Sequence, residues 1–207
     1  VFALPALALF CLLVLKVGLS LPRRRDYVFA LLIGSLLAAH WATVFHAIKV
    51  STVSIATIAL FTFPIITILI EPLVFRHALL RRDLISGLVV LFGVVLLVPA
   101  VGFDNSTFAG VFWGVISAFA YALRNILVRK YLNHCPGGTA MFYQMLAIVI
   151  VLSPFLDWQM DLAVDHRLLY LIGLGVLFTA LPNTLFVNSL KQMSAKTASL
   201  VSCLHPL

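Results

Sequence analysis

The chain has little charge for its length. Only 10% of its 207 residues are charged, against 63% that are hydrophobic, and its mean hydropathy is +1.13. A soluble domain of this size carries about a quarter charged residues. The apolar runs are also too long and too evenly apolar for barrel strands, which alternate at a period of two. The composition therefore predicts an all-α polytopic membrane protein, a multi-pass helical bundle in a plasma or inner membrane.

Several patterns that mark other functions are absent from the sequence. The three cysteines, Cys11, Cys135 and Cys203, show no CxxC or other metal spacing, so neither a disulfide framework nor a metal site is predicted. There is no P-loop, which argues against ATP-driven transport, and no cofactor is predicted. The net charge of +7 is explained by membrane orientation, as shown next, so nucleic acid is not a predicted partner.

Apolar stretches long enough to span a bilayer, which takes about 20 residues, follow one another along the chain. They fall at about 1–19, 27–48, 52–75, 84–101, 107–130, 139–157 and 167–190, and another begins near 194. The connections after the first, third, fifth and seventh stretches are basic, with Arg23, Arg24, Arg25, Arg76, Arg81, Arg82, Arg129, Lys130, Lys191 and Lys196. The other connections hold only Lys49 and Arg167 as bases. Basic loops favour the cytoplasmic side, so the first set is predicted to be cytoplasmic.

The segment around Lys49 is weakly similar to the segment around Lys191, 142 positions later. Without gaps, Ala56 then aligns with Ala198 and Pro64 with Pro206. Five predicted spans lie between the two lysines, and an odd number places them on opposite faces of the membrane. The chain is therefore predicted to contain an inverted repeat, which is typical of secondary transporters.

The arrangement of small motifs resembles a known family. The first copy has Ser54-Ile55-Ala56-Thr57, then Pro64 and Glu71, a basic loop, and Gly87 and Gly93; the second has Gly110, the run Ser117–Ala122, Ala198 and Pro206. This pattern is similar to the drug/metabolite transporter superfamily, in particular its EamA-type members. One departure is Pro72, which follows Glu71 where the family commonly has a base.

The resemblance implies ten spans in two inverted five-helix repeats. Residues 1–101 would form the first repeat without its first helix. Residues 107–207 would form the second repeat, truncated in its fourth helix, with the last helix missing. Substrate would bind near the membrane midplane, between the repeats, in a cavity lined by the second, third, fifth and seventh predicted spans.

Polar residues inside the predicted spans are the candidates for that cavity, because burying them in hydrocarbon is costly. His40 and Trp41 align with Pro182 and Asn183 under the repeat, so His40, Trp41 and Asn183 are predicted to lie at comparable depth. His40 has two interpretations. It lines the cavity, with proton carriage as a further role that the ordinary near-neutral pKa of an imidazole allows, or it is satisfied by a carbonyl of a neighbouring helix.

The fifth predicted span carries a second set. Trp113, Ser117, Tyr121, Arg124 and Asn125 are three or four residues apart and share one helical stripe. Aromatic and hydrogen-bonding groups with one cation suit an amphipathic or anionic metabolite. The alternative is that Arg124 extends to the lipid headgroups. Gly110 and Gly114 on this span predict close contact with another helix.

Gate and hinge candidates come from irregular backbone and from the only glutamate. Pro64 and Pro182 each remove a backbone N–H within a span, which predicts a bend or an opening toward a cavity; a tolerated kink is the alternative. Glu71 lies near the end of its span and is predicted to pair with Arg76 or another base as a latch, or to be a plain interfacial carboxylate.

The predicted function is a permease that moves small metabolites by alternating access without covalent chemistry, with the lipid bilayer as its environment. The alternatives are an intramembrane transferase that uses His40 or His46 with Glu71, and a membrane scaffold that does not transport. The sequence leaves proton coupling and a homodimer open.

Overall fold

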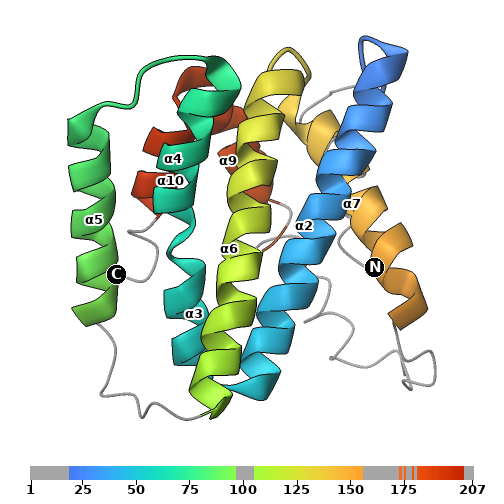
Figure 1. The fold of residues 1–207 in the computed structure, drawn as a ribbon. Coiled ribbons are helices and arrows are strands. Elements are labelled where there is room, and N and C mark those ends of the chain that lie inside the picture. The colour runs from blue at the N-terminus through green and yellow to red at the C-terminus, as the bar shows by residue number, and fades with distance from the viewer. Residues whose placement is uncertain are drawn as a thin grey trace. The chain divides into compact units, whose positions relative to one another are not determined.

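The computed structural model describes residues 19–96, 105–155, 173, 175, 179 and 181–202, and the regular elements of this part are all helical. In chain order they are α2 (Arg24–Val50), α3 (Val53–Leu60), α4 (Phe63–Phe75), α5 (Arg81–Leu96), α6 (Asn105–Tyr131), α7 (Gly137–Leu152), the 3-10 helix η1 (Ser153–Phe155), α9 (Leu181–Gln192) and α10 (Ala195–Ser202) (Figure 1). The predicted all-α class is confirmed. Residues 1–18 of the span predicted at 1–19, and just under half of the span predicted at 167–190, lie outside the described residues.

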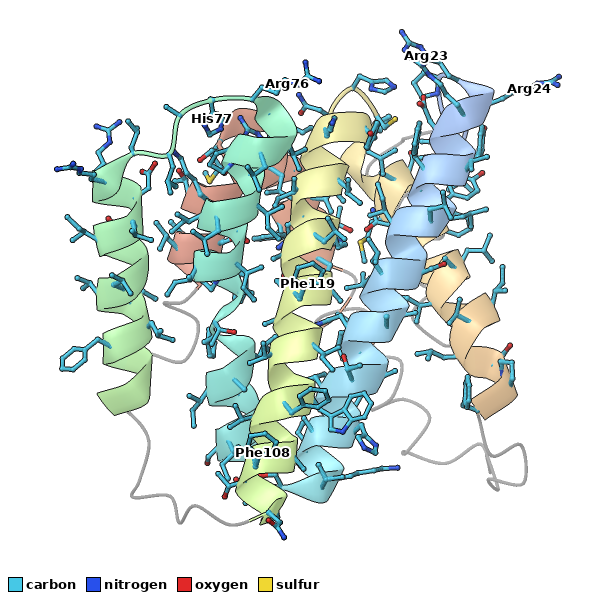
Figure 2. The ribbon with its side chains drawn as sticks, in the orientation of Figure 1. Arg23, Arg24, Arg76, His77, Phe108 and Phe119 are labelled. Atoms are coloured by element: carbon cyan, nitrogen blue, oxygen red, sulfur yellow. The ribbon has the colours of Figure 1, made fainter. Side chains whose placement is uncertain are left out.

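Four helical segments among the described residues are long and apolar enough to cross a membrane: Arg24–Val50, Val53–Phe75, Asn105–Tyr131 and Gly137–Phe155. The helix α6 shows how they are built. Phe108 and Phe119 extend from this helix (Figure 2) and are 76% and 50% exposed, whereas Arg124 is fully buried. This is the reverse of a soluble helix, because the exposed side is apolar and the buried side carries the polar groups. The chain is an integral membrane protein of several helices.

The chain packs into two compact units. One contains Val1–Ala38 and Val128–Gln192, and the other contains Ala39–Leu127 and Met193–Leu207. In the first unit α7 packs against α9; in the second α4 packs against α5 and α10. Each unit contains residues from both predicted repeats, so the packing units do not coincide with the repeats. Close packing and internal sequence similarity are separate properties. The division into repeats at 1–101 and 107–207 stays a prediction.

The offset between the two sequence copies recurs in their local structure. The helices α3 and α10 begin 142 positions apart, at Val53 and Ala195. The hydroxyl residues that precede them, Thr52 and Ser194, are related by the same offset. Each accepts a hydrogen bond from the backbone N–H three residues later, at 3.3 and 3.2 Å respectively. The two copies therefore cap a helix in the same way, which satisfies a backbone donor that has no partner within its own helix.

The apolar segment Val53–Phe75 is interrupted between α3 and α4 (Figure 1). Pro64 is the second residue of α4, and its ring nitrogen has no proton to donate to the carbonyl of Leu60. The backbone N–H and the hydroxyl of Thr62 both donate to the carbonyl of Ala59, at 3.2 and 2.7 Å, which tightens the end of α3. The helix is broken where the sequence predicts a bend; the role of Pro64 as a hinge stays a prediction.

Small residues bring α6 close to the segment that contains α3. A Cβ atom added at Gly114 would lie 2.4 Å from the Cβ atom of Ala59, and one added at Gly110 would lie 2.3 Å from that of Ser51. Both distances are shorter than van der Waals contact, so only glycine fits without a shift of the neighbouring backbone. The close approach predicted for this stripe is confirmed.

Candidate functional site

A reciprocal pair of hydrogen bonds joins α2 to α6. The Ser117 hydroxyl donates to the backbone carbonyl of His40 at 3.0 Å, and its oxygen lies 2.8 Å from the Nδ1 atom of His40. The same Nδ1 atom lies 3.2 Å from the Ser117 carbonyl oxygen. Because the single hydroxyl proton points to the His40 carbonyl, both contacts at Nδ1 require a proton on that nitrogen. In the neutral ring Nε2 is then a hydrogen-bond acceptor.

Three further polar residues lie on the next turns of α6. The Arg124 guanidinium donates to the Oδ1 atom of Asn125 at 3.0 Å, and both side chains are fully buried. Tyr121, one turn earlier on α6, lies close to both side chains. The Nδ2 amide of Asn125 is buried and has no hydrogen-bond partner among the described residues. A buried donor without a partner is costly, so it marks a position where a ligand or water would be bound favourably.

Aromatic rings surround this polar group. The ring of Tyr121 lies 4.7 Å from that of His40 and 5.1 Å from that of Phe63, between centroids. Phe63 begins α4 and packs on Ala118 and Ala122 of α6, so the break before α4 delivers an aromatic side chain to the cluster. The residues that share these contacts, here called the α6 polar cluster, are His40, Ser117, Tyr121, Arg124 and Asn125.

The two predicted tryptophans lie at the edges of the cluster. The Trp41 ring is 6.2 Å from that of His40 and 5.5 Å from that of Phe45. The Trp113 ring packs edge-on against His46 at 4.8 Å, one turn of α6 before Ser117. Trp113 therefore belongs to the same stripe as the cluster but contacts a different part of α2.

The structure bears on the alternative interpretations of two buried polar side chains. Arg124 is fully buried, which argues against its extension to the lipid headgroups. His40 is 8% exposed and bonded to a neighbouring helix, as the alternative for that residue predicts. Its second ring nitrogen leaves the predicted ligand-binding role open.

Asn183 and Pro182 belong to the other packing unit, at the beginning of α9. The Asn183 amide donates to the carbonyl of Thr179 at 2.8 Å, and Pro182 is exposed. The contact of Asn183 is therefore local, with a residue four positions earlier in the chain. The common depth of His40, Trp41 and Asn183 stays a prediction.

Glu71 binds the N-terminus of α10. Its two carboxylate oxygens accept hydrogen bonds from the backbone N–H groups of Ala195 and Lys196, each at 2.9 Å. Such a carboxylate satisfies two orphan donors and complements the positive end of the helix dipole. The Lys196 amine reaches Asp83 of α5 at 2.5 Å. Arg76, the base that the sequence suggested as partner, is exposed just after α4 (Figure 2).

Sequence reasoning missed two contributors. Phe63 attracts no attention in an apolar run, and only the break before α4 turns it toward Tyr121. The sequence gives no signal that the N-terminus of α10 is the partner of Glu71, because the partner groups are backbone N–H groups, which nearly every residue has. Ser117 stood in the predicted stripe, and its spacing from Tyr121 was the signal that placed it near the site.

Comparisons with known proteins agree with the architecture. Residues 108–207 match the model of the EamA-like transporter family. An uncharacterized transporter of Bacillus subtilis (strain 168), YxxF, is 26% identical over 188 residues, which cover 88% of this chain and 60% of the relative. The chain thus spans about 60% of that relative's length. A protein of known crystal structure has the same fold, with a TM-score of 0.75 and 19% identity, over 99% of this chain and 75% of that one.

Proposed function

We propose that this chain, whose residues 108–207 match the model of the EamA-like transporter family, moves small metabolites across a plasma or inner membrane by alternating access. The α6 polar cluster is the observation that carries this proposal. It gathers a buried cation, a buried amide donor and an imidazole within helices apolar enough to span a bilayer. Ionisable groups at such positions are expensive, so a function is the expected reason for them.

The chemistry of the cluster favours a substrate with both an anionic or acceptor group and an apolar body. Arg124 supplies positive charge, and the Nδ2 atom of Asn125 supplies a donor. The rings of Tyr121 and Phe63 supply an apolar surface beside them. A carboxylate-bearing, amphipathic metabolite matches all of these groups. His40 is the proposed proton carrier if transport is coupled to a proton gradient.

The break between α3 and α4 supports movement near the cluster. Phe63 follows the break directly and packs against Tyr121, so a change in the angle of α4 shifts a wall of the cluster. Glu71, on the same helix, holds the start of α10. Pro64 is the proposed hinge and Glu71 the proposed latch of the gate.

The contacts of the same residues argue against the transferase alternative. His40 is bonded to Ser117, the His46 ring packs on Trp113, and Glu71 binds backbone N–H groups of α10. General acid–base catalysis needs the acid and the base to converge on one reacting atom. His40, His46 and Glu71 have three different sets of partners and so do not converge in this way. We therefore propose a binding site and no enzymatic activity.

The test is transport by the intact protein in proteoliposomes, with a panel of labelled carboxylate metabolites. His40→Ala and Arg124→Ala are each expected to lower transport about tenfold or more, since each removes a polar contact to the substrate. Lys130→Ala is the matched control: it removes an exposed base at the end of the same helix and leaves transport unchanged.

Two outcomes contradict the proposal. Unchanged transport in both cluster variants, with folding intact, would remove the α6 polar cluster as the binding site. Absence of transport by folded wild-type protein for every substrate in the panel would favour the scaffold alternative.

A further inference from the structure

Three side chains with different donor atoms meet at the start of α2, in the first packing unit. Asp26 lies in the first turn of α2, and His134 and Cys135 lie in the connection between α6 and α7. The His134 Nε2 atom is 2.9 Å from the Oδ2 atom of Asp26. One ligand atom of each residue lies within 4.8 Å of the other two. The function proposed above uses none of these residues.

We propose that Asp26, His134 and Cys135 form a binding site for Zn²⁺ or a divalent cation of similar softness. A carboxylate oxygen, an imidazole nitrogen and a thiolate are the three ligand types that zinc takes in proteins. In a tetrahedral zinc site such atoms are about 3.4–3.6 Å apart, as follows from bond lengths of about 2.0–2.3 Å. The observed cluster reaches that geometry through shifts on the order of 1 Å.

Burial and charge fit a cation at this position. Asp26 is 1% exposed and Cys135 is fully buried, whereas the His134 side chain is 42% exposed and offers a path from solvent. The carboxylate and the thiolate together balance the two charges of the metal. Binding releases the thiol proton of Cys135 to solvent, and His134 binds through Nε2 with its proton on Nδ1.

Neighbouring groups position Asp26 and Cys135 through hydrogen bonds that leave both residues able to bind a metal. The Arg23 backbone N–H donates to the Oδ2 atom of Asp26 at 3.1 Å, which fixes the carboxylate. The Lys191 amine donates to the backbone carbonyl of Cys135, so it fixes the loop and not the sulfur. Outer contacts of this kind orient metal ligands. The metal would tie the start of α2 to the connection before α7.

Cobalt absorption tests the site on the intact protein. The protein is purified through a tag without histidine or cysteine, stripped with a chelator, and titrated with Co²⁺. We expect one bound Co²⁺ per chain, with thiolate-to-cobalt charge-transfer absorption that Zn²⁺ abolishes by displacement. Cys135→Ser should lose this absorption, and His134→Gln should weaken Co²⁺ binding about tenfold or more.

Matched controls use the other cysteines and an exposed histidine. The double variant Cys11→Ser, Cys203→Ser and the variant His77→Gln should keep the charge-transfer absorption. Its absence in wild type or in the double cysteine variant overturns the proposal, as does its persistence in Cys135→Ser. The wild-type and double-variant measurements leave the cluster intact, so they decide the question even if Cys135→Ser fails to fold. Transport is not a readout, so the result is independent of the proposed function.

Discussion

The Nδ1 atom of His40 lies 2.8 Å from the Oγ atom of Ser117, and the Ser117 hydroxyl donates in return to the backbone carbonyl of His40. This reciprocal contact fixes the imidazole of α2 against α6 and sets which ring nitrogen carries the proton. The sequence leaves the role of this histidine ambiguous, and the contact makes it an oriented group whose Nε2 atom is an acceptor in the neutral form.

Ser117→Ala removes the contact that orients His40. Two hydrogen bonds are lost and the buried Nδ1 keeps only the longer contact to the Ser117 carbonyl, so the protein should be destabilised by about 1–3 kcal/mol. Thermal unfolding in detergent measures this. Ser86→Ala is the control, because that exposed hydroxyl donates to the Arg82 carbonyl within α5 and its loss should shift stability by less than about 0.5 kcal/mol. Equal effects of the two variants would show that the His40 contact is not a special one.

Asn125→Asp separates binding from folding. The variant keeps the acceptor for Arg124 but replaces the buried Nδ2 donor that has no partner among the described residues. We expect normal expression and unfolding but transport lowered about tenfold or more, because a carboxylate repels an anionic substrate. Asn133→Asp, at an exposed loop position, should transport normally. If Asn125→Asp keeps full transport, the amide is not a substrate donor.

Gly114→Ala tests the close approach of α6 to α3. The new Cβ would meet the Cβ of Ala59 at 2.4 Å, so the helices must separate, at a cost of about 1–3 kcal/mol. Gly93→Ala makes the same chemical change in α5, where no atom lies within 4 Å of the added Cβ. There the greater helix propensity of alanine should raise stability by up to about 1 kcal/mol. Opposite signs are expected in thermal unfolding, and a stabilising Gly114→Ala would refute the packing.

Glu71→Gln and Asp83→Asn remove one negative charge each from two contacts of the α10 start. Glu71 is fully buried and caps two backbone N–H groups, whereas Asp83 is half-buried and pairs with a lysine side chain. Loss of the buried cap should cost about 1–2 kcal/mol, and loss of the more accessible ion pair less than about 1 kcal/mol. Unfolding midpoints rank the two variants, and the reverse order would mean that Glu71 contributes little as a latch.

Pro64→Ala tests the hinge. Alanine restores the backbone N–H, so α3 and α4 can join into one continuous helix and the gate should stiffen. We expect a stability equal to or above wild type together with slower transport. Pro72→Ala is the matched control, because Pro72 lies inside α4, away from the break, and should leave the transport rate unchanged. Equal transport by wild type and Pro64→Ala would remove Pro64 as a hinge.

Some features of the fold could be read directly from particular residues. The stripe of Gly110 and Gly114 predicts close helix contact, because a missing side chain is a local property of the sequence. Pro64 predicts interruption of its helix for the same reason, since the lost N–H needs no knowledge of other segments. The offset of 142 positions predicted matching segments, and matching caps at Thr52 and Ser194 were found.

The partners of polar groups could not be read in this way. The placement of Glu71 against α10 depends on a contact between positions 124 residues apart. The same holds for Asp26 and His134, which are 108 residues apart and share no spacing motif. Burial of Arg124 depends on which face of α6 meets other helices. The sequence does not decide this, because α6 carries apolar residues on several faces and any of these faces could contact lipid.

The sequence by itself determined that this protein is a membrane-embedded helical bundle, because hydrophobicity summed over about 20 residues decides whether a segment lies in lipid or in water. It also determined where the backbone is interrupted or closely packed, since proline and glycine act locally. Only the tertiary structure decided that His40 is held by Ser117, that Arg124 is buried, and that Asp26, His134 and Cys135 converge. Hydrogen bonds and ligand sets depend on distances of a few ångströms between distant positions, which are fixed only when the helices pack.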